Sequence, residues 1–237
     1  MKTKKAVILL SGGIDSTTTL YYAKSKGFKC YALIFDYGQR HVREIRSAVR
    51  IAKAAKIPYQ IIKIKLPWKG SSLLDKDIRI PGNRDIRRIG KGIPSTYVPG
   101  RNTIFLSFAV SYAEAIGAEA VFIGANAIDF SGYPDCRPQY YNVFQKVIQK
   151  GTRAGNIKIL TPLINLKKSQ IIRLGLKLGA PLYLTWSCYR GGKYPCGVCD
   201  SCRIREKGFK ELTPSIISPL LRGRCHEQKR VTKGVKR

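Results

Sequence analysis

The 237-residue chain is poor in acidic residues. It holds 14 Asp and Glu against 44 Lys and Arg, which gives a formal net charge of +30 at pH 7. Such a charge permits nucleic-acid binding, because phosphates attract basic proteins whatever their fold. The basic residues are spread over the whole length, however, and cluster only at 83–91 and in the C-terminal tail. Charge therefore decides nothing about reaction chemistry, and we expect nucleic acid to bind non-specifically if at all.

The N-terminal region also lacks a long apolar run. Only five apolar residues, Ala6 to Leu10, stand between the basic start of the chain and Ser11. That run is too short for the apolar region of a secretory signal or for a membrane-spanning helix. We therefore expect a cytoplasmic protein that associates with no membrane.

Cysteine is present, but its placement argues against disulfides. Of the seven Cys, four crowd into a short C-terminal stretch: Cys188, Cys196, Cys199 and Cys202. In a cytoplasmic chain such crowding indicates metal binding. Four thiolates form a closed tetrahedral site, the usual arrangement for one structural zinc ion. An iron–sulfur cluster takes the same ligands and is the alternative.

Short apolar runs alternate along the chain with segments of helical periodicity. The predicted strands cover 6–10, 29–35, 59–64, 120–123 and 157–160. The predicted helices begin at Asp15 and further cover 42–56, 102–116, 139–150 and 167–178. This is the pattern of βαβ units. The sequence therefore predicts an α/β protein with an open, mainly parallel five-stranded sheet and helices on both faces.

The length and the cysteine cluster predict the domain organisation. We expect one α/β domain over 1–182, a small zinc-binding segment over 183–210 packed on it, and a basic tail over 211–237. The connection 66–100 is rich in Pro and Gly, and a connection of that length is usually a functional lid or mobile.

The first predicted strand runs into a turn, SGGIDS at 11–16, and then into a helix. Asp15 and Ser16 stand where N-cap and first-turn residues belong. Two glycines allow close approach of the backbone to a ligand. Backbone amides of the turn and the helix N-terminus would converge on a point that favours an anion. Phosphate is the natural occupant, although an ordinary strand–turn–helix corner has the same pattern.

Two further loops follow predicted strands, and ligands of open α/β sheets bind beyond the carboxyl ends of the strands. The loop after the second strand reads FDYGQRH at 35–41, which offers polar groups to a nucleotide or is a plain turn. The loop after the fourth strand contains carboxylates, Tyr133 and Arg137, which suit a polar heterocycle. Arg101 can hold a phosphate or carboxylate bidentately, and Asn102 fits an N-cap.

The SGGIDS turn resembles the SGGxDS signature of the PP-loop ATP pyrophosphatases, which have a Rossmann-like (HUP) fold. It is not a Walker A loop, because no Lys follows the glycines. The resemblance implies that the loop holds the pyrophosphate of ATP while the α-phosphate is attacked. The implied ATP-binding residues are Leu10, Ser11, Gly12, Gly13, Ile14, Asp15, Ser16, Thr17, Thr18, Thr19 and Leu20.

Residues 6–210 as a whole resemble the nitrile-forming 7-cyano-7-deazaguanine synthase family of queuosine and archaeosine biosynthesis. The motifs that carry the resemblance are SGGIDSTT at 11–18, FDYGQRH at 35–41, TYVPGRN at 96–102, SGYPDCRP at 131–138, TWSCY at 185–189 and CGVCDSC at 196–202. The family converts 7-carboxy-7-deazaguanine, ammonia and ATP to 7-cyano-7-deazaguanine, with zinc on the four matched Cys. Gln139 and Gln170 depart from the pattern, since family members usually carry Glu there.

The reaction and the resemblance together define candidate roles. A carboxylate is a poor electrophile, so ATP converts it to an acyl-adenylate, ammonia gives an amide, and a second adenylylation permits elimination to the nitrile. The candidate catalytic residues are Ser11, Asp15, Ser16 and Lys168. Asp15 is placed to help bind the Mg²⁺ that accompanies ATP. The candidate substrate contacts are Tyr97, Arg101, Asn102, Asp129, Tyr133, Asp135 and Arg137. We expect a homodimer.

An alternative function is that of a PP-loop enzyme that thiolates tRNA through adenylylation of a tRNA base. Such an enzyme would use the charge of +30. Against it, no Cys stands in a clear persulfide-carrier pattern, and no separate RNA-binding domain is visible in the sequence.

Overall fold

Five short runs rich in β-branched and other apolar residues form a parallel sheet at the centre of the protein, as expected for strands covered on both faces. The structure, a computed structural model, describes residues 3–85, 89, 92–126 and 132–212. The strand order is β3-β2-β1-β4-β5, and all neighbouring pairs are parallel. The strands are β1 (Lys5–Leu9), β2 (Lys29–Asp36), β3 (Tyr59–Lys63), β4 (Ala120–Phe122) and β5 (Lys158–Leu160). The predicted five-stranded parallel sheet is confirmed.

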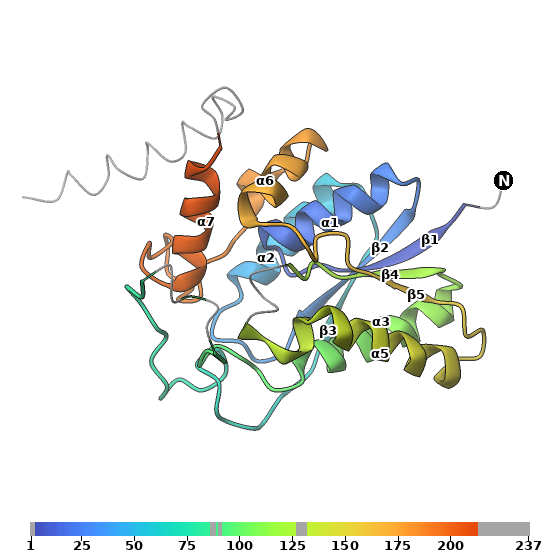
Figure 1. The fold of residues 1–237 in the computed structure, drawn as a ribbon, viewed down its shortest axis with the longest axis horizontal. Coiled ribbons are helices and arrows are strands. Elements are labelled where there is room, and N and C mark those ends of the chain that lie inside the picture. The colour runs from blue at the N-terminus through green and yellow to red at the C-terminus, as the bar shows by residue number, and fades with distance from the viewer. Residues whose placement is uncertain (1–2, 86–88, 90–91, 127–131, 213–237) are drawn as a thin grey trace, which may run out of the picture.

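Helices cover both faces of this sheet, as predicted. They are α1 (Ile14–Ser25), α2 (Arg43–Ala54), α3 (Arg101–Ile116), α5 (Pro138–Gly151), α6 (Lys168–Lys177) and α7 (Asp200–Lys210), with short 3₁₀ turns η2 (Pro134–Cys136) and η3 (Leu182–Leu184). α1, α2 and α6 lie on one side of the sheet and α3 and α5 on the other (Figure 1). Helix α7, within the segment that carries the four clustered cysteines, was not predicted as a helix.

The central strand β1 is buried on both faces. Val7 and Leu9 pack with residues of α3 and α5, whereas Ala6 and Ile8 pack with residues of α1 and α2. All four are at most 7% exposed. Burying an aliphatic side chain such as Ile or Leu contributes roughly 1.5–3 kcal/mol. The strand therefore fixes the position of the loop that leaves its carboxyl end.

The strand order places a ligand crevice next to that loop. β1 lies between β2 and β4. The strand order reverses there, because β2 and β3 follow on one side of β1 and β4 and β5 on the other. In open α/β sheets, ligands bind at such a switch point, outside the carboxyl ends of the strands. Residues 10–13 follow β1 and residues 123–126 follow β4, so both segments meet at the crevice.

The C-terminal part of the described chain, residues 183–210, is called the cysteine segment below. Its helix α7 packs against α6, with Gly208 close to Lys168 and Ile172. The long connection after β3 also reaches this segment. Asn83 N donates to Val198 O at 2.9 Å, and Arg84 forms an ion pair with Asp200.

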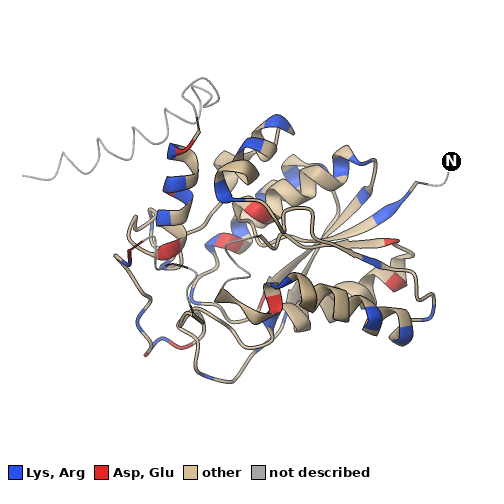
Figure 2. Ribbon diagram, viewed as in Figure 1, with Lys and Arg blue, Asp and Glu red and all other residues tan. Residues whose placement is uncertain are grey.

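Basic residues are not confined to one part of the structure. Lys and Arg occur in both helical layers and on α7, in keeping with their even spread along the sequence (Figure 2). Among the residues that the structure describes, no helix has the length and apolar character needed to cross a membrane.

Candidate active site

The loop between β1 and α1 is held in shape by its own polar groups. Ser11 N donates to Ser16 Oγ at 3.2 Å, and the two hydroxyls lie 3.0 Å apart. Thr17 Oγ1 donates to Gly13 O at 2.7 Å. Gly13 is the N-cap of α1, and no side chain caps this helix end. The first amides of α1 are therefore left for a ligand, and with the helix dipole they favour an anion.

Two glycines bring this loop into close backbone contact with its neighbours. Gly12 has a φ of +85°, and a Cβ there would lie 2.7 Å from Ala48 N and would also overlap Glu44 O, both in α2. A Cβ on Gly124, after β4, would lie 2.9 Å from Ser16 N. The absence of side chains at both positions lets α2 and the end of β4 pack directly on the loop.

Replacing Gly12 by Ala is expected to lower the free energy of unfolding by roughly 2–4 kcal/mol, because it adds strain at positive φ to overlap with α2. Gly27 is the matched control. Its φ is +80°, but a Cβ there meets nothing within 4 Å, so Gly27→Ala should lose only about 1 kcal/mol. Urea unfolding of both variants measures the difference, and equal losses would show that contact with α2 is unimportant.

Asp15, in the first turn of α1, forms an ion pair with Lys168, at the start of α6. Lys168 Nζ lies 2.7 Å from both carboxylate oxygens of Asp15, and Asn126 Nδ2 donates to the same carboxylate at 3.2 Å. The side chains of Lys168 and Asp15 are only 14% and 22% exposed. Three elements, α1, α6 and the segment after β4, thus converge on one charged pair.

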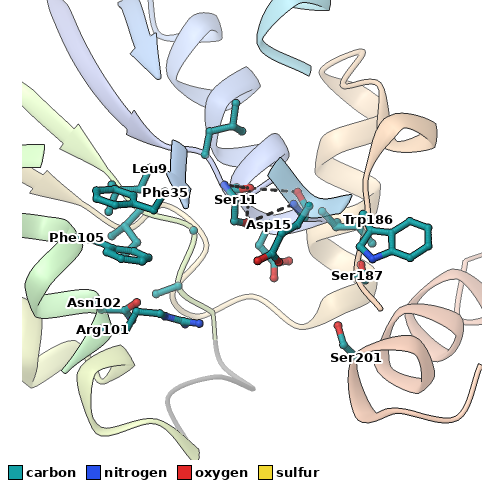
Figure 3. A pocket seen from close by; sticks show the side chains of 18 of the residues that line it. Leu9, Ser11, Asp15, Phe35, Arg101, Asn102, Phe105, Trp186, Ser187 and Ser201 are labelled. Atoms are coloured by element: carbon teal, nitrogen blue, oxygen red, sulfur yellow. Dashed lines mark hydrogen bonds between the residues drawn. The ribbon is translucent and has the colours of Figure 1, made fainter. Parts of the chain in front are cut away.

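A cavity of about 280 Å³ opens beside this pair. The loop after β1, the end of β2, the start of α3 and the cysteine segment line it (Figure 3). Its apolar wall includes the rings of Phe35 and Phe105, which stack with centroids 3.9 Å apart and planes 8° from parallel. A cavity that joins an aromatic surface to an anion-binding loop suits a flat heterocycle next to a phosphate.

Three polar residues that line the cavity, Tyr37, Glu44 and Arg101, form a cluster with Gln39. Burial raises the pKa of Tyr37 to about 12. Burial also raises the pKa of Glu44 to about 7, although Arg101 and a hydrogen bond from Gln39 oppose the shift. Burial alone would lower the pKa of Arg101, but Tyr37 and other neighbouring groups outweigh it and raise that pKa.

The candidate ATP-binding residues fall into two groups. Those that line the cavity are Leu10, Ser11, Gly13, Ile14, Asp15 and Ser16. The other five, Gly12, Thr17, Thr18, Thr19 and Leu20, do not line it. Leu20 belongs to the apolar core, and Thr18 Oγ1 donates to Ile171 O at 3.5 Å. The motif therefore combines residues that face a ligand with residues that hold α1 in place.

The candidate substrate contacts are brought together in part. Arg101, Asn102 and Tyr133 line the cavity. Asp135 is buried and accepts from Asn102 N at 3.0 Å, so these two residues are used to fix the start of α3.

The remaining candidates lie away from the cavity or outside the described residues. Tyr97 packs on Tyr133 with ring centroids 6.0 Å apart, and Arg137 is exposed at the start of α5. Asp129 lies outside the residues that the structure describes.

Gln139 and Gln170, which replace the usual Glu of the resembled family, are both exposed and outside the cavity. Gln170 Oε1 accepts from Lys167 N at 2.8 Å and so caps the start of α6. An amide oxygen accepts this bond as a carboxylate would. Neither replacement therefore changes a residue that lines the described cavity.

The four clustered cysteines form a candidate metal centre. Their sulfur atoms all lie within 4.8 Å of one another. Cys188, Cys199 and Cys202 are at most 7% exposed. Cys196 N points to Cys188 Sγ and Cys199 N to Cys196 Sγ, each at 3.4 Å. A tetrahedral thiolate site with bonds of about 2.3 Å needs sulfurs about 4 Å apart, so this donor set fits a soft divalent metal ion.

The cysteine segment also forms one wall of the cavity. Trp186, Ser187 and Ser201 are among the residues that line it (Figure 3). Trp186 N donates to Gly12 O at 2.9 Å, which joins the segment to the loop after β1. Arg205 holds this wall, because its guanidinium donates to Ser187 Oγ at 3.2 Å. The metal centre and the cavity are therefore mechanically linked.

Several lining residues were not named as site residues from the sequence: Glu44, Phe105 and Arg205, and also Phe35, Trp186, Ser187 and Ser201, which lie within motifs that carry the resemblance. Glu44 stands three residues after the FDYGQRH motif, in the first turn of α2, where a charged residue is usually solvated. The sequence feature that could have identified Glu44 is its position in the first helical turn after a loop that faces the ligand. Phe105 has the spacing of a core residue, and no pattern distinguishes it from one.

A family model and individual relatives of known name assign the chain to the same family. A family model described as "Queuosine biosynthesis protein QueC" matches residues 5–213. A 7-cyano-7-deazaguanine synthase of Nostoc punctiforme is 55% identical over 223 residues, covering 92% of this chain and 99% of the relative. One of Thermoplasma volcanium is 53% identical over 211 residues, covering 88% and 87% respectively.

Among solved structures, the U34-tRNA thiolase NcsA of Methanococcus maripaludis with its 4Fe–4S cluster is 16% identical. The match covers 100% of this chain and 75% of the thiolase, at a TM-score of 0.47. A similarity of that size carries no argument about the reaction. The family model and the relatives at 53–55% identity do carry one, and the chain belongs to the QueC family of queuosine biosynthesis proteins.

Proposed function

We propose that the chain is an enzyme, an ATP-dependent carbon–nitrogen ligase that converts 7-carboxy-7-deazaguanine and ammonia to 7-cyano-7-deazaguanine. The observation that carries the proposal is the identity of 55% over 99% of the length of a relative with that name. The site supports it independently, because a cavity with an aromatic surface adjoins an anion-binding loop. ATP, the carboxylate substrate and ammonia are its small-molecule partners.

The reaction requires two activations by ATP. A carboxylate cannot release oxide, so its oxygen attacks the α-phosphorus of ATP, pyrophosphate leaves, and an acyl-adenylate forms. Ammonia displaces AMP to give an amide. The amide oxygen then attacks a second ATP, and loss of AMP leaves the nitrile. Both activations release pyrophosphate, so one anion-binding loop serves both.

The loop after β1 would bind the phosphates of ATP. The uncapped amides of α1 and the hydroxyls of Ser11 and Ser16 would stabilise the charge of the departing pyrophosphate. Asp15 offers one carboxylate, which is what Mg²⁺ bound to ATP phosphates usually takes from a protein. When bound beside Asp15, Mg²⁺ would neutralise negative charge on the phosphates of ATP. Lys168 would orient Asp15 and contribute a positive charge beside the α-phosphate.

Arg101 and Tyr133 are our proposed substrate contacts within the described cavity. Arg101 is a buried cation beside Tyr37, and a guanidinium binds a carboxylate bidentately. Tyr133 Oη lies 2.9 Å from Thr96 Oγ1, which fixes its ring at the cavity wall. Asn102 and Asp135 would act by positioning the start of α3, which carries Arg101.

We further propose that the four clustered cysteines hold one zinc ion with a structural role. A closed set of four thiolates would supply folding free energy, and no cavity residue belongs to it. This gives one α/β domain over 1–182, the zinc-binding segment over 183–210 and a basic tail over 211–237. Reduced thiolates suit the cytoplasm, and exposed Phe108, Val143 and Val147 on α3 and α5 would suit a homodimer interface.

Incubation with ATP, Mg²⁺, ammonium and 7-carboxy-7-deazaguanine tests the proposal. We expect AMP and pyrophosphate to appear at two molecules each per nitrile, with the amide as an intermediate. Liquid chromatography with mass detection identifies the amide and the nitrile. Release of ADP and phosphate, or an absence of nitrile, would contradict the proposal.

A further inference from the structure

Nitrile formation removes every proton from the substrate nitrogen. An ammonium ion carries four protons and a nitrile nitrogen none. Two protons leave as the amide forms, one as the amide is adenylylated, and one as AMP departs. A base beside the nitrogen is therefore needed at each stage, and none of the roles assigned above supplies it.

Glu44 is the described carboxylate best placed for this task. It lies in the first turn of α2, the turn whose backbone packs directly on Gly12 of the phosphate-binding loop. Its side chain lines the cavity, as do Asp15 and Arg101. The reacting carbon must lie next to the α-phosphate in both activations. A residue fixed to the loop and facing the same cavity is therefore near the nitrogen attached to that carbon.

The other ionisable groups at the cavity are less suited to act as the base. Asp15 has both carboxylate oxygens 2.7 Å from Lys168 Nζ. Arg101 remains protonated, because its neighbours raise its pKa. Tyr37 holds its proton as well, since burial raises its pKa to about 12.

The surroundings of Glu44 match a base that works near neutral pH. Burial raises its pKa to about 7, while Arg101 and a hydrogen bond from Gln39 keep the carboxylate from shifting further. Such a group is ionised often enough to accept a proton and acidic enough to release it again. Arg101 of α3, together with Tyr37 and Gln39 of the β2–α2 loop, are the polar groups that face it.

We propose that Glu44 is the general base that takes the protons from the substrate nitrogen, an inference that rests on the proposed function. Ammonium gives one proton to Glu44, and its nitrogen then attacks the acyl-adenylate. The C–N bond forms, the C–O bond to AMP breaks with its electron pair on AMP, and a second proton leaves to give the amide.

The amide is then activated in the same site. Its oxygen bonds to the α-phosphorus of ATP, pyrophosphate leaves with the electron pair of the broken P–O bond, and the nitrogen loses its third proton. Finally the C–O bond breaks with its electrons on AMP, the electrons of the last N–H bond complete the triple bond, and the fourth proton goes to Glu44. Between steps Glu44 passes each proton to water in the open cavity.

Replacing Glu44 by Gln tests this role, since the amide keeps the shape and can still bond Gln39. We expect conversion of the supplied amide to nitrile to fall by about 10²-fold or more. The first adenylylation, followed as pyrophosphate release without ammonium, removes no proton from nitrogen and should stay within about threefold of wild type. Glu119→Gln is the control, because Glu119 is exposed and precedes β4 at the opposite end of the sheet.

Each outcome separates this inference from the proposed function. If wild type forms no nitrile, the proposed function fails. If wild type forms nitrile and Glu44→Gln forms it equally fast, only the role of Glu44 is overturned. Equal loss of adenylylation and of nitrile formation in a folded variant would also overturn it, because Glu44 would then serve ATP rather than the nitrogen.

The pH profile of the wild-type enzyme gives a test that does not depend on folding of the variant. Glu44 acts only when ionised, so amide-to-nitrile conversion should fall about tenfold per pH unit once the pH is well below 7. The first adenylylation should lack that acidic limb. Identical profiles for the two steps would overturn the proposal.

Discussion

The Cys199→Ser variant is expected to lose its metal and to unfold or aggregate rather than merely to turn over more slowly. Cys199 is fully buried in the sulfur cluster, and it also pairs through its backbone with Gly82 of the long connection. Loss of one thiolate opens the metal site. The cysteine segment then has little apolar core of its own, because its buried cluster is composed chiefly of the cysteines and Ile80.

The expected loss is large because metal binding and folding are coupled. Structural zinc binds zinc-finger peptides with apparent free energies of about 10–16 kcal/mol, whereas whole domains are stable by only about 5–15 kcal/mol. A loss of about 4 kcal/mol would lower the Tm by roughly 8–16 °C in a chain of this size. Because Trp186 joins the segment to Gly12, the loop after β1 would be disturbed as well.

Metal analysis and thermal unfolding measure this outcome. Wild type should carry about one zinc per chain without the visible absorption of an iron–sulfur cluster. Cys30→Ser is the matched control, since Cys30 is only 2% exposed but belongs to the core between the sheet and α1 and α2. It should keep its zinc. A stable, metal-free Cys199→Ser protein would contradict a structural role, and stoichiometric iron would contradict zinc.

The strands and most helices could be predicted because they depend on local patterns. Val7 and Ile8 belong to an uninterrupted apolar run, which indicates a strand buried on both faces. Helix α7 escaped prediction because its face toward the core carries Cys202 and Gly208 rather than a stripe of large apolar side chains. Contact with α6 stabilises it instead, as would a metal ion on the four cysteines, and neither feature has a helical period in the sequence.

Local patterns alone predicted the candidate site only where one short motif contains both the backbone feature and the chemical group. The SGGIDS loop and the clustered cysteines are of that kind. Arg101, Tyr133 and Lys168, which also line the cavity, were candidates from the family resemblance. The pairing of Asp15 with Lys168 joins residues 153 positions apart, and the strand order decides it rather than any local pattern. Glu44 is a stronger case, because burial raises its pKa to about 7 while Arg101, a residue of another helix, opposes that shift.

The second large effect is expected at Asp15. Replacement by Asn keeps the size of the side chain but removes the charge that faces Lys168 and the proposed Mg²⁺. Loss of one preorganised electrostatic contact in an active site typically lowers the rate by about 10²–10³-fold. Pyrophosphate release should therefore fall by that factor, while ATP should bind as tightly or more tightly, because the site becomes more positive. A near-normal rate would show that Asp15 takes no part.

A double variant separates the effect of Asp15 on stability from the catalytic role of the Asp15–Lys168 pair. Asp15→Asn alone leaves Lys168, which is 14% exposed, as an unpaired cation and should destabilise by about 1–3 kcal/mol. Adding Lys168→Gln removes that charge, so stability should recover while turnover stays low. Asp77→Asn is the control, because the Lys69–Asp77 pair is 78% and 85% exposed and contributes little. If turnover recovered together with stability, Asp15 would serve only as the counter-ion of Lys168 and would have no catalytic role.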